Sequence, residues 1–232
     1  MWPQDATTNY LFFLRLIHIL AGITWIGMLY FFNLVNVNFM KALDAPTKGK
    51  VVPILMPKAL FWFRWGAMFT VIAGLLLHLG TVTSEAHGMP SYFWIWLIVV
   101  LAAFWVGTFL FTAFKKDGRV LWVAYLVLMI VVSVVLWKVH VGQNTSWKVL
   151  SIALGGGMGI VMFMNVWMVI WPLQKKIIAA TSAQAQAGTA PPPEMPAWAR
   201  RAFLASRTNT WLSLPMLFFM GAASHFPIGI GK

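Results

Sequence analysis

Residues 91–114, SYFWIWLIVVLAAFWVGTFLFTAF, form an apolar run without a single charged side chain. The run is longer than the roughly 20 residues that an α-helix needs to cross a bilayer. The whole chain has the same character, because 60% of its 232 residues are hydrophobic and only 9% are charged, whereas a soluble domain carries roughly 25% charged residues. The sequence therefore predicts an all-α membrane protein whose solvent is the lipid bilayer.

Similar apolar runs on either side predict about six transmembrane helices. They lie at about 9–34, 59–82, 91–114, 119–141, 147–172 and 199–222. The sixth is the least apolar, because Arg207, Thr208 and Asn209 interrupt it and must face protein, water or lipid headgroups. We expect one polytopic helix bundle, with residues 1–232 forming a single transmembrane domain.

Lysine and arginine are distributed unevenly between the connections of this bundle. The first, third and fifth connections are basic, whereas the second contains no lysine or arginine. Because basic connections stay on the cytoplasmic side of a membrane, six crossings place both termini outside, an N-out and C-out topology. The net charge of +12 is thereby explained by membrane orientation, and we expect no nucleic-acid partner.

The stretch TSAQAQAGTAPPPE, residues 181–194, lacks apolar periodicity and is rich in Ala, Gln and Pro. This composition predicts a flexible cytoplasmic linker at about 179–197, before the last helix. The chain contains no cysteine, which excludes disulfides, thiolate metal sites and covalent attachment of a c-type haem within it. Its N-terminus lacks the features of a cleaved signal peptide, so we expect the first helix to be retained.

The histidines form the most informative pattern. The predicted spans contain no Asp or Glu, which argues against a carboxylate proton relay or a carboxylate-coupled transporter. All five histidines instead fall in or beyond the outer half of the predicted bundle, namely His18, His78, His87, His140 and His225. Any chemistry of the bundle is therefore expected to face outward.

His18 and His78 lie on different predicted helices, at depths of ~14 Å and ~6 Å from the outer boundary. Two such histidines can supply opposite axial ligands to the iron of a haem b. Gly22 and Gly74 each lie four residues from one of them, which leaves room for a macrocycle. Arg15 shares the helix face of His18 and lies shallower, where it could reach a haem propionate. We expect these five residues to bind the cofactor.

The same residues have other interpretations. A histidine near a helix end can simply hydrogen-bond a backbone carbonyl. Alternatively, Arg15, His18, Lys138 and His140 could form a basic pocket for an anionic small molecule, with Lys138 and His140 binding substrate. The sequence does not separate this pocket from a haem site.

Two further motifs have modest interpretations. The run GGGMG at 155–159 permits either close helix packing or a flat ligand against the backbone. Arg64, in the sequence FWFRWG, is explained by snorkelling or by stacking on Trp62 or Trp65. We assign Arg64 no catalytic role.

Four segments carry a resemblance to a known family. They are RLIHILAGITWIGMLYFFNLVN at 15–36, PKALFWFRWGAMFTVIAGLLL at 57–77, MGIVMFMNVWMVIWPLQKKII at 158–178 and RRAFLASRTNTWLSLPMLFFMGAASHF at 200–226. Together they resemble the membrane domain of the bacterial urate hydroxylase family, the urate oxidase N-terminal domain. The first segment also resembles, more distantly, helices with haem-associated histidines in the membrane protoporphyrinogen oxidase and copper-resistance membrane families.

The resemblance implies a multi-pass oxidoreductase of the bacterial inner membrane that hydroxylates urate and passes electrons to a fused cytochrome c domain. This chain has no CxxCH motif, so the acceptor is expected to be a separate cytochrome c. Two functions therefore remain open. One is a redox protein with haem b; the other is a non-catalytic transmembrane subunit of a larger respiratory or photosynthetic complex.

Overall fold

The computed structural model describes residues 5–85, 90–114, 116–142 and 145–225, and every regular element in these ranges is helical. Two of the helical stretches contain a π-helical segment, η1 or η2, between two α-helices. The elements are α1 (Ala6–Tyr30), η1 (Phe31–Asn36), α2 (Val37–Ala42), α3 (Ala45–Glu85), α4 (Pro90–Ala113), α5 (Gly118–Gly142), α6 (Trp147–Met164), η2 (Asn165–Ile170), α7 (Trp171–Ala187) and α8 (Met195–His225).

The helices are long and apolar, as the sequence predicted. Within the described residues, five stretches are long and apolar enough to cross a membrane: Ala6–Ala42, Ala45–Ser84, Ser91–Ala113, Gly118–His140 and Trp147–Ala187. The sixth predicted helix lies within α8, whose 31 residues rise about 46 Å. Its length suffices to span the bilayer, but basic and polar side chains lower its hydropathy. The chain is thus an all-α, multi-pass membrane bundle.

The second helix begins much earlier than residue 59. Asp44 caps the start of α3 by accepting a hydrogen bond from the Thr47 amide at 2.9 Å, and the hydrogen bonds from Thr47 hold the pKa of the Asp44 carboxyl below its usual value. Pro53 and Pro57 lie inside the helix without ending it. Proline donates no backbone hydrogen bond, and packing against α7 offsets the stability that the helix loses in this way. The two helices are close here, because a Cβ on Gly49 would lie 2.9 Å from the Ala185 Cβ.

The linker predicted at about 179–197 is shorter in the structure, and this boundary was wrong. The fifth helical stretch continues through Pro172 to Ala187, and only residues 188–194 connect it to α8. Pro172 stands at the beginning of α7, where the Trp171 amide bonds the Val166 carbonyl in a π-type turn. The helix ends where Gly188 adopts a left-handed conformation, φ 63°, which glycine adopts without steric cost.

Buried amides hold α8 in the bundle. Ser206, Asn209 and Ser213 recur every three or four residues and so share one face of α8. Asn209 accepts a hydrogen bond from the Asn165 Nδ2 at 2.8 Å and donates one to the Met162 carbonyl at 2.9 Å. Its side chain therefore joins α8 to both α6 and η2. Asn209 thus faces protein, one of the environments predicted for it.

The other two residues of this face bond the first helical stretch. Ser206 accepts a hydrogen bond from the Asn33 Nδ2 at 2.8 Å. The Ser213 hydroxyl lies 3.0 Å from the Tyr30 hydroxyl. Asn33 and Asn165 both belong to π-helical segments, so each π-helical segment presents an amide to α8.

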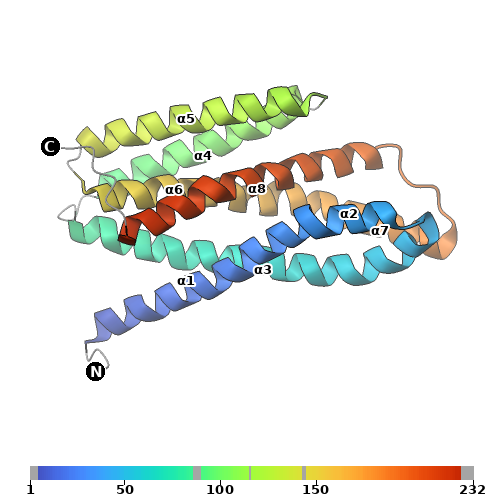
Figure 1. Cartoon of the computed structure of the whole chain (residues 1–232), viewed down its shortest axis with the longest axis horizontal. Helices are drawn as coiled ribbons and strands as arrows, with labels where there is room; N and C mark the ends of the chain where they lie inside the picture. The colour runs from blue at the N-terminus through green and yellow to red at the C-terminus, as the bar shows by residue number, and fades with distance from the viewer. Residues whose placement is uncertain (1–4, 86–89, 115, 143–144, 226–232) are drawn as a thin grey trace.

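Three layers of helices make up the bundle (Figure 1). The stretch α1 to α2 packs along α3, while α6, η2 and α7 lie against α8 between this layer and the hairpin of α4 and α5. The connections 43–44, 114–117 and 188–194 lie at one end, and α1 begins and α8 ends at the other (Figure 1). The predicted basic connections therefore share one end of the bundle.

The predicted orientation can be tested with single cysteines, because the native sequence contains none. Ser224, near the end of α8, and Ala190, in the connection 188–194, are both exposed. In intact cells, a membrane-impermeant maleimide should label Ser224→Cys, whereas Ala190→Cys should react only after permeabilisation. Labelling of Ala190→Cys alone would invert the orientation, and equal labelling of both would show that α8 does not cross.

The buried network predicts that Asn209 stabilises the bundle. Asn209→Ala removes two hydrogen bonds and leaves the Asn165 amide unpaired, so we expect destabilisation by about 1–2 kcal/mol. The measurement is the Tm of the purified protein in detergent. Asn38→Ala is the control, because Asn38 is exposed and bonds only the Leu34 carbonyl of its own helical stretch. Equal Tm values for the two variants would contradict this role of Asn209.

Candidate functional site

A cavity of about 400 Å³ lies between α1, α3, α6 and α8. Its volume falls within the range of small-molecule sites in proteins. The walls are mostly aliphatic, with Trp25 and Trp96 as the aromatic residues. The lining also contains two histidines and several glycines: His18, Gly22, Gly74, His78, Gly156 and Gly159. Four of the five residues predicted to bind a cofactor therefore line one cavity.

The His18 imidazole is fixed against α3. Its Nδ1 lies 2.8 Å from the Thr70 carbonyl oxygen. A carbonyl only accepts hydrogen bonds, so Nδ1 carries the proton and Nε2 retains a free lone pair. The ring also lies over Gly74, where an added Cβ would be 2.9 Å from the His18 Cε1. Gly74 thus provides the space in which the imidazole sits.

His78 lies one helical turn beyond Gly74 and is 3% exposed. Its ring meets Trp96 at 4.6 Å between centroids and Phe93 at 6.0 Å. Both ring nitrogens are buried without a hydrogen-bond partner among the described residues. Each of the other described side chains that has a buried nitrogen or oxygen without a hydrogen-bond partner has only one such atom. A buried imidazole without a partner is costly, which marks His78 as a candidate ligand-binding residue.

Trp25 adds a third unpartnered nitrogen to this cavity. Its Nε1 is buried without a hydrogen-bond partner, and the side chain is 1% exposed. Trp96, by contrast, donates its indole hydrogen to the Ala153 carbonyl at 2.8 Å. The cavity therefore offers one indole donor and two imidazoles to a ligand.

The glycines of the run 155–159 in α6 lie on two different faces of the helix. A Cβ on Gly155 would lie 3.1 Å from the Met216 carbonyl oxygen of α8, and one on Gly157 would lie 3.0 Å from Val100 of α4. These two glycines permit close helix packing. Gly156 and Gly159 line the cavity instead. Close helix packing is therefore confirmed for part of the run, and a flat ligand against the other glycines stays a prediction.

The remaining predicted residues lie away from the cavity. Arg15 and Lys138 are exposed and do not line it. His140 is buried near the end of α5, where its Nδ1 contacts the Thr145 hydroxyl. The structure therefore does not assemble the alternative basic pocket, because α5 belongs to the layer opposite α1 (Figure 1).

His225 does not line the cavity. His225 is exposed at the end of α8, and His87 lies outside the described residues. The described residues also contain no cluster of three or more His, Asp or Glu side chains that could hold a bare metal ion. Two histidines nevertheless suffice for a haem iron, because the macrocycle supplies the other ligands.

Sequence reasoning missed the partners of several residues. The Thr70 carbonyl that orients His18 is a backbone group, which no side-chain motif reveals. Arg64 stacks on Trp171, with 3.9 Å between its guanidinium carbon and the ring centroid, and its other aromatic neighbour is Trp167 at 5.7 Å. Stacking was predicted on Trp62 or Trp65 from their closeness in sequence, whereas α3 meets η2 and α7 there.

Comparison with known proteins identifies the family. The sequence model described as urate oxidase N-terminal matches residues 43–232. The match covers most of the chain and includes His78, while His18 precedes it. No curated protein and no solved structure matches the chain. The chain belongs to the urate oxidase N-terminal family.

Proposed function

We propose that this multi-pass membrane protein binds haem b between α1 and α3 and passes electrons to a separate cytochrome c. The observation that carries this proposal is the pairing of His18 and His78 in one apolar cavity, where His78 has no other partner for its two ring nitrogens. Haem b would supply reversible one-electron chemistry there. The protein's own residues bind it, orient it and keep water away.

The donor set suits a haem iron. His18 presents Nε2 in the tautomer that a metal ligand requires, because the Thr70 carbonyl holds its Nδ1 hydrogen. Neither ring nitrogen of His78 has a hydrogen-bond partner among the described residues, so no such bond must break for His78 to become a ligand. Gly22, Gly156 and Gly159 line the cavity without a side chain, which would leave room for a flat macrocycle, whereas Gly74 makes room for the His18 ring.

The polarity of the cavity favours electron transfer over urate binding at this position. Urate is a polar anion and needs several hydrogen-bond donors and acceptors, since buried polar groups without partners are costly. The described lining contains no Lys, Arg, Asn or Gln. We therefore place no urate in this cavity and assign it to a cofactor.

The position of the cavity suits an external acceptor. His18 lies in the first half of the helical stretch Ala6–Ala42, and His78 and Met220 lie near the ends of α3 and α8. The cavity is thus closer to the end where α1 begins, which the charge pattern assigns to the outer side. These 232 residues contain no cysteine and so cannot themselves attach a c-type haem; we propose a separate cytochrome c as the acceptor.

A reduced-minus-oxidised absorption spectrum of the purified protein tests the ligand assignment. We expect a b-type haem signal in the wild type and its loss in His18→Ala and in His78→Ala, because each variant removes one axial ligand. His140→Ala is the matched control, since it removes another buried histidine that does not line the cavity. The dithionite-reduced wild type should also reduce added cytochrome c.

The outcomes separate the parts of the proposal. Absence of haem from the wild type, even when cells are grown with added haem precursor, would overturn it. Haem that survives both substitutions would contradict the ligands but not the redox function. A haem-free protein that purifies in a fixed ratio with other subunits would favour the non-catalytic subunit instead.

The contact between Gly74 and His18 gives a second, independent prediction, which concerns haem affinity. Gly74→Leu would displace the His18 ring, because even a Cβ at this position comes within 2.9 Å of it. Changes that disturb ligand orientation typically weaken metal binding by about 10–100-fold, and we expect a haem affinity lowered on that scale. Gly80→Leu in the same helix is the control, since a Cβ there meets nothing within 4 Å. Equal haem titrations for both variants would contradict the proposed geometry.

A further inference from the structure

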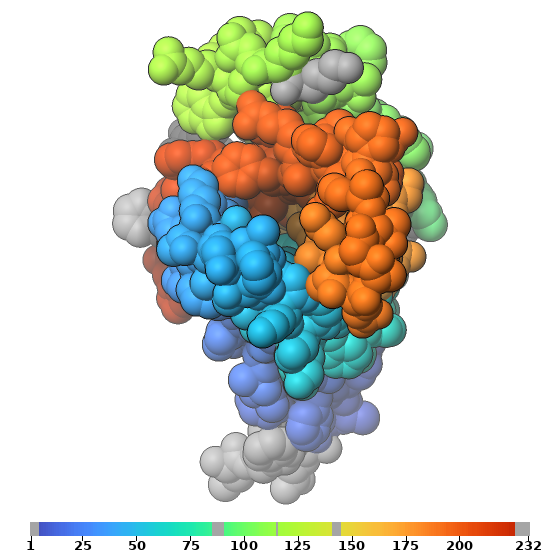
Figure 2. All heavy atoms as spheres, turned by 90° about the vertical axis from the view of Figure 1, so that its right-hand side faces the viewer, coloured from blue at the N-terminus to red at the C-terminus, as the bar shows by residue number. Residues whose placement is uncertain are grey.

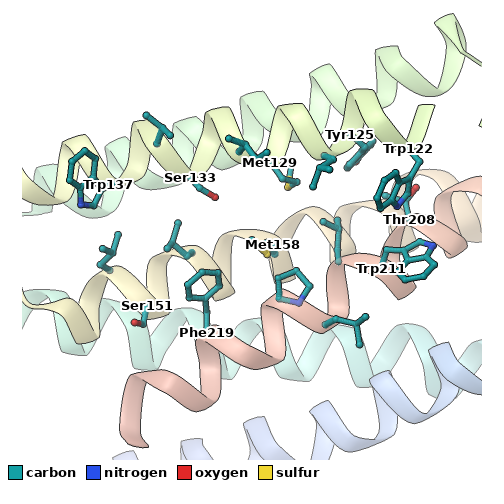
Figure 3. A pocket seen from close by; sticks show the side chains of 18 of the residues that line it. Trp122, Tyr125, Met129, Ser133, Trp137, Ser151, Met158, Thr208, Trp211 and Phe219 are labelled. Carbon is teal, nitrogen blue, oxygen red and sulfur yellow. The ribbon is translucent and has the colours of Figure 1, made fainter. Parts of the chain in front are cut away.

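A second, larger hollow separates α5 from α6 and α8 (Figure 3). We call it the α5 groove; its volume is about 660 Å³. Ser133 and Met129 point into it from α5, and Met158 and Phe219 face it from α6 and α8 (Figure 3). None of the residues proposed to bind haem lines this groove.

The walls of the groove are continuous stripes. On α5 the lining residues recur every three or four positions from Trp122 to Trp137, a rise of about 22 Å. On α8 the stripe runs from Thr208 to Phe219. The surface is almost entirely apolar, apart from a few hydroxyl groups. It therefore suits a long hydrocarbon chain.

Both stripes lead to arginine at the same end. Continuing each stripe by one or two turns reaches Arg119 on α5 and Arg200 on α8. The two helices meet there, because a Cβ on Gly118 would lie 3.4 Å from the Arg200 Nη2. Figure 2 looks onto this end and shows the start of α5 beside α8. Both arginines are exposed.

The other charges at this end leave an excess of positive charge. Arg201 and Lys116 are exposed nearby in the chain. The Asp117 carboxylate is the acidic group next to them, and it already accepts the backbone amides of Arg119 and Val120 at 2.9 and 3.2 Å. At the start of α5 and of α8 the described residues thus place four cations, Lys116, Arg119, Arg200 and Arg201, against the two carboxylates of Asp117 and Glu194.

Aromatic rings mark the boundary between the charged and the apolar part. Trp122 and Trp211 approach each other edge to face, with 6.3 Å between ring centroids. Both line the groove at its arginine end (Figure 3). Tryptophan is enriched at the headgroup level of membranes. The order from end to centre is thus guanidinium, indole and hydrocarbon, which matches the order of groups in a phospholipid.

We propose that the α5 groove binds an anionic phospholipid of the cytoplasmic leaflet, with its phosphate at Arg119 and Arg200 and an acyl chain between α5 and α8. Basic pockets between transmembrane helices on the cytoplasmic side recognise anionic headgroups in this way. Arginine suits the phosphate, because its planar guanidinium donates two parallel hydrogen bonds. This site is independent of the proposed haem site.

Lipid binding to the purified, delipidated protein tests the proposal, with native mass spectrometry as the readout. Wild-type protein should bind phosphatidylglycerol more tightly than phosphatidylcholine. Arg119→Gln/Arg200→Gln should weaken phosphatidylglycerol binding by roughly 30-fold, at about one kcal/mol for each cation. Lys138→Gln/Lys148→Gln is the matched control, because it removes two cations next to Trp137 and Trp147 at the opposite end. This control should bind phosphatidylglycerol like the wild type.

A second variant tests the apolar part. Ser133→Trp fills the groove and should weaken binding of both lipids, because Ser133 points into its centre (Figure 3). Equal affinity of the wild type for both lipids would overturn the proposal, and this comparison needs no variant to fold. Loss of binding in the lysine control alone, or displacement of lipid by a stoichiometric partner helix, would also overturn it.

Discussion

A bilayer offers no hydrogen bonds to groups inside it, and this constraint determines how the helices of this protein are arranged. Asparagine side chains in the middle of the bundle must find partners on other helices. Asn165 donates a hydrogen bond to Asn209, Asn209 donates one to the Met162 carbonyl, and Asn33 donates one to Ser206. The polar face of α8, the least apolar helix, therefore bonds both π-helical segments, while its buried Leu204, Leu212 and Met216 add apolar packing.

The same constraint makes the exceptions informative. His78 is buried as deeply as the paired asparagines, yet neither ring nitrogen has a partner among the described residues. His18 differs, because the Thr70 carbonyl satisfies one of its nitrogens and fixes the tautomer. One histidine is thus oriented and the other is unsatisfied, and both line the same cavity. The cofactor that we propose would remove the cost at His78 without breaking the hydrogen bond of His18.

Sequence reasoning succeeded where a property is local. Uninterrupted apolar runs predicted the helices, and the four-residue spacing of each histidine from a glycine predicted which residues share a helix face. It failed where the answer depends on which helices are neighbours. Pro53 remains inside α3 because α7 packs beside it, and Lys138 lies far from His18 because α5 belongs to another layer. Neither fact is encoded in the residues near those positions.

The cavity and the α5 groove lie on opposite sides of the same two helices. On α6, Gly156 faces the cavity while Met158 faces the groove. On α8, Met220 faces the cavity and Phe219 faces the groove. A helix with contacts on both sides is apolar all round, which accounts for the lack of a polar face on α6. A lipid chain in the groove would pack against the back of the cavity wall. That lipid chain would support α6 and α8 from the side that faces away from His18 and His78.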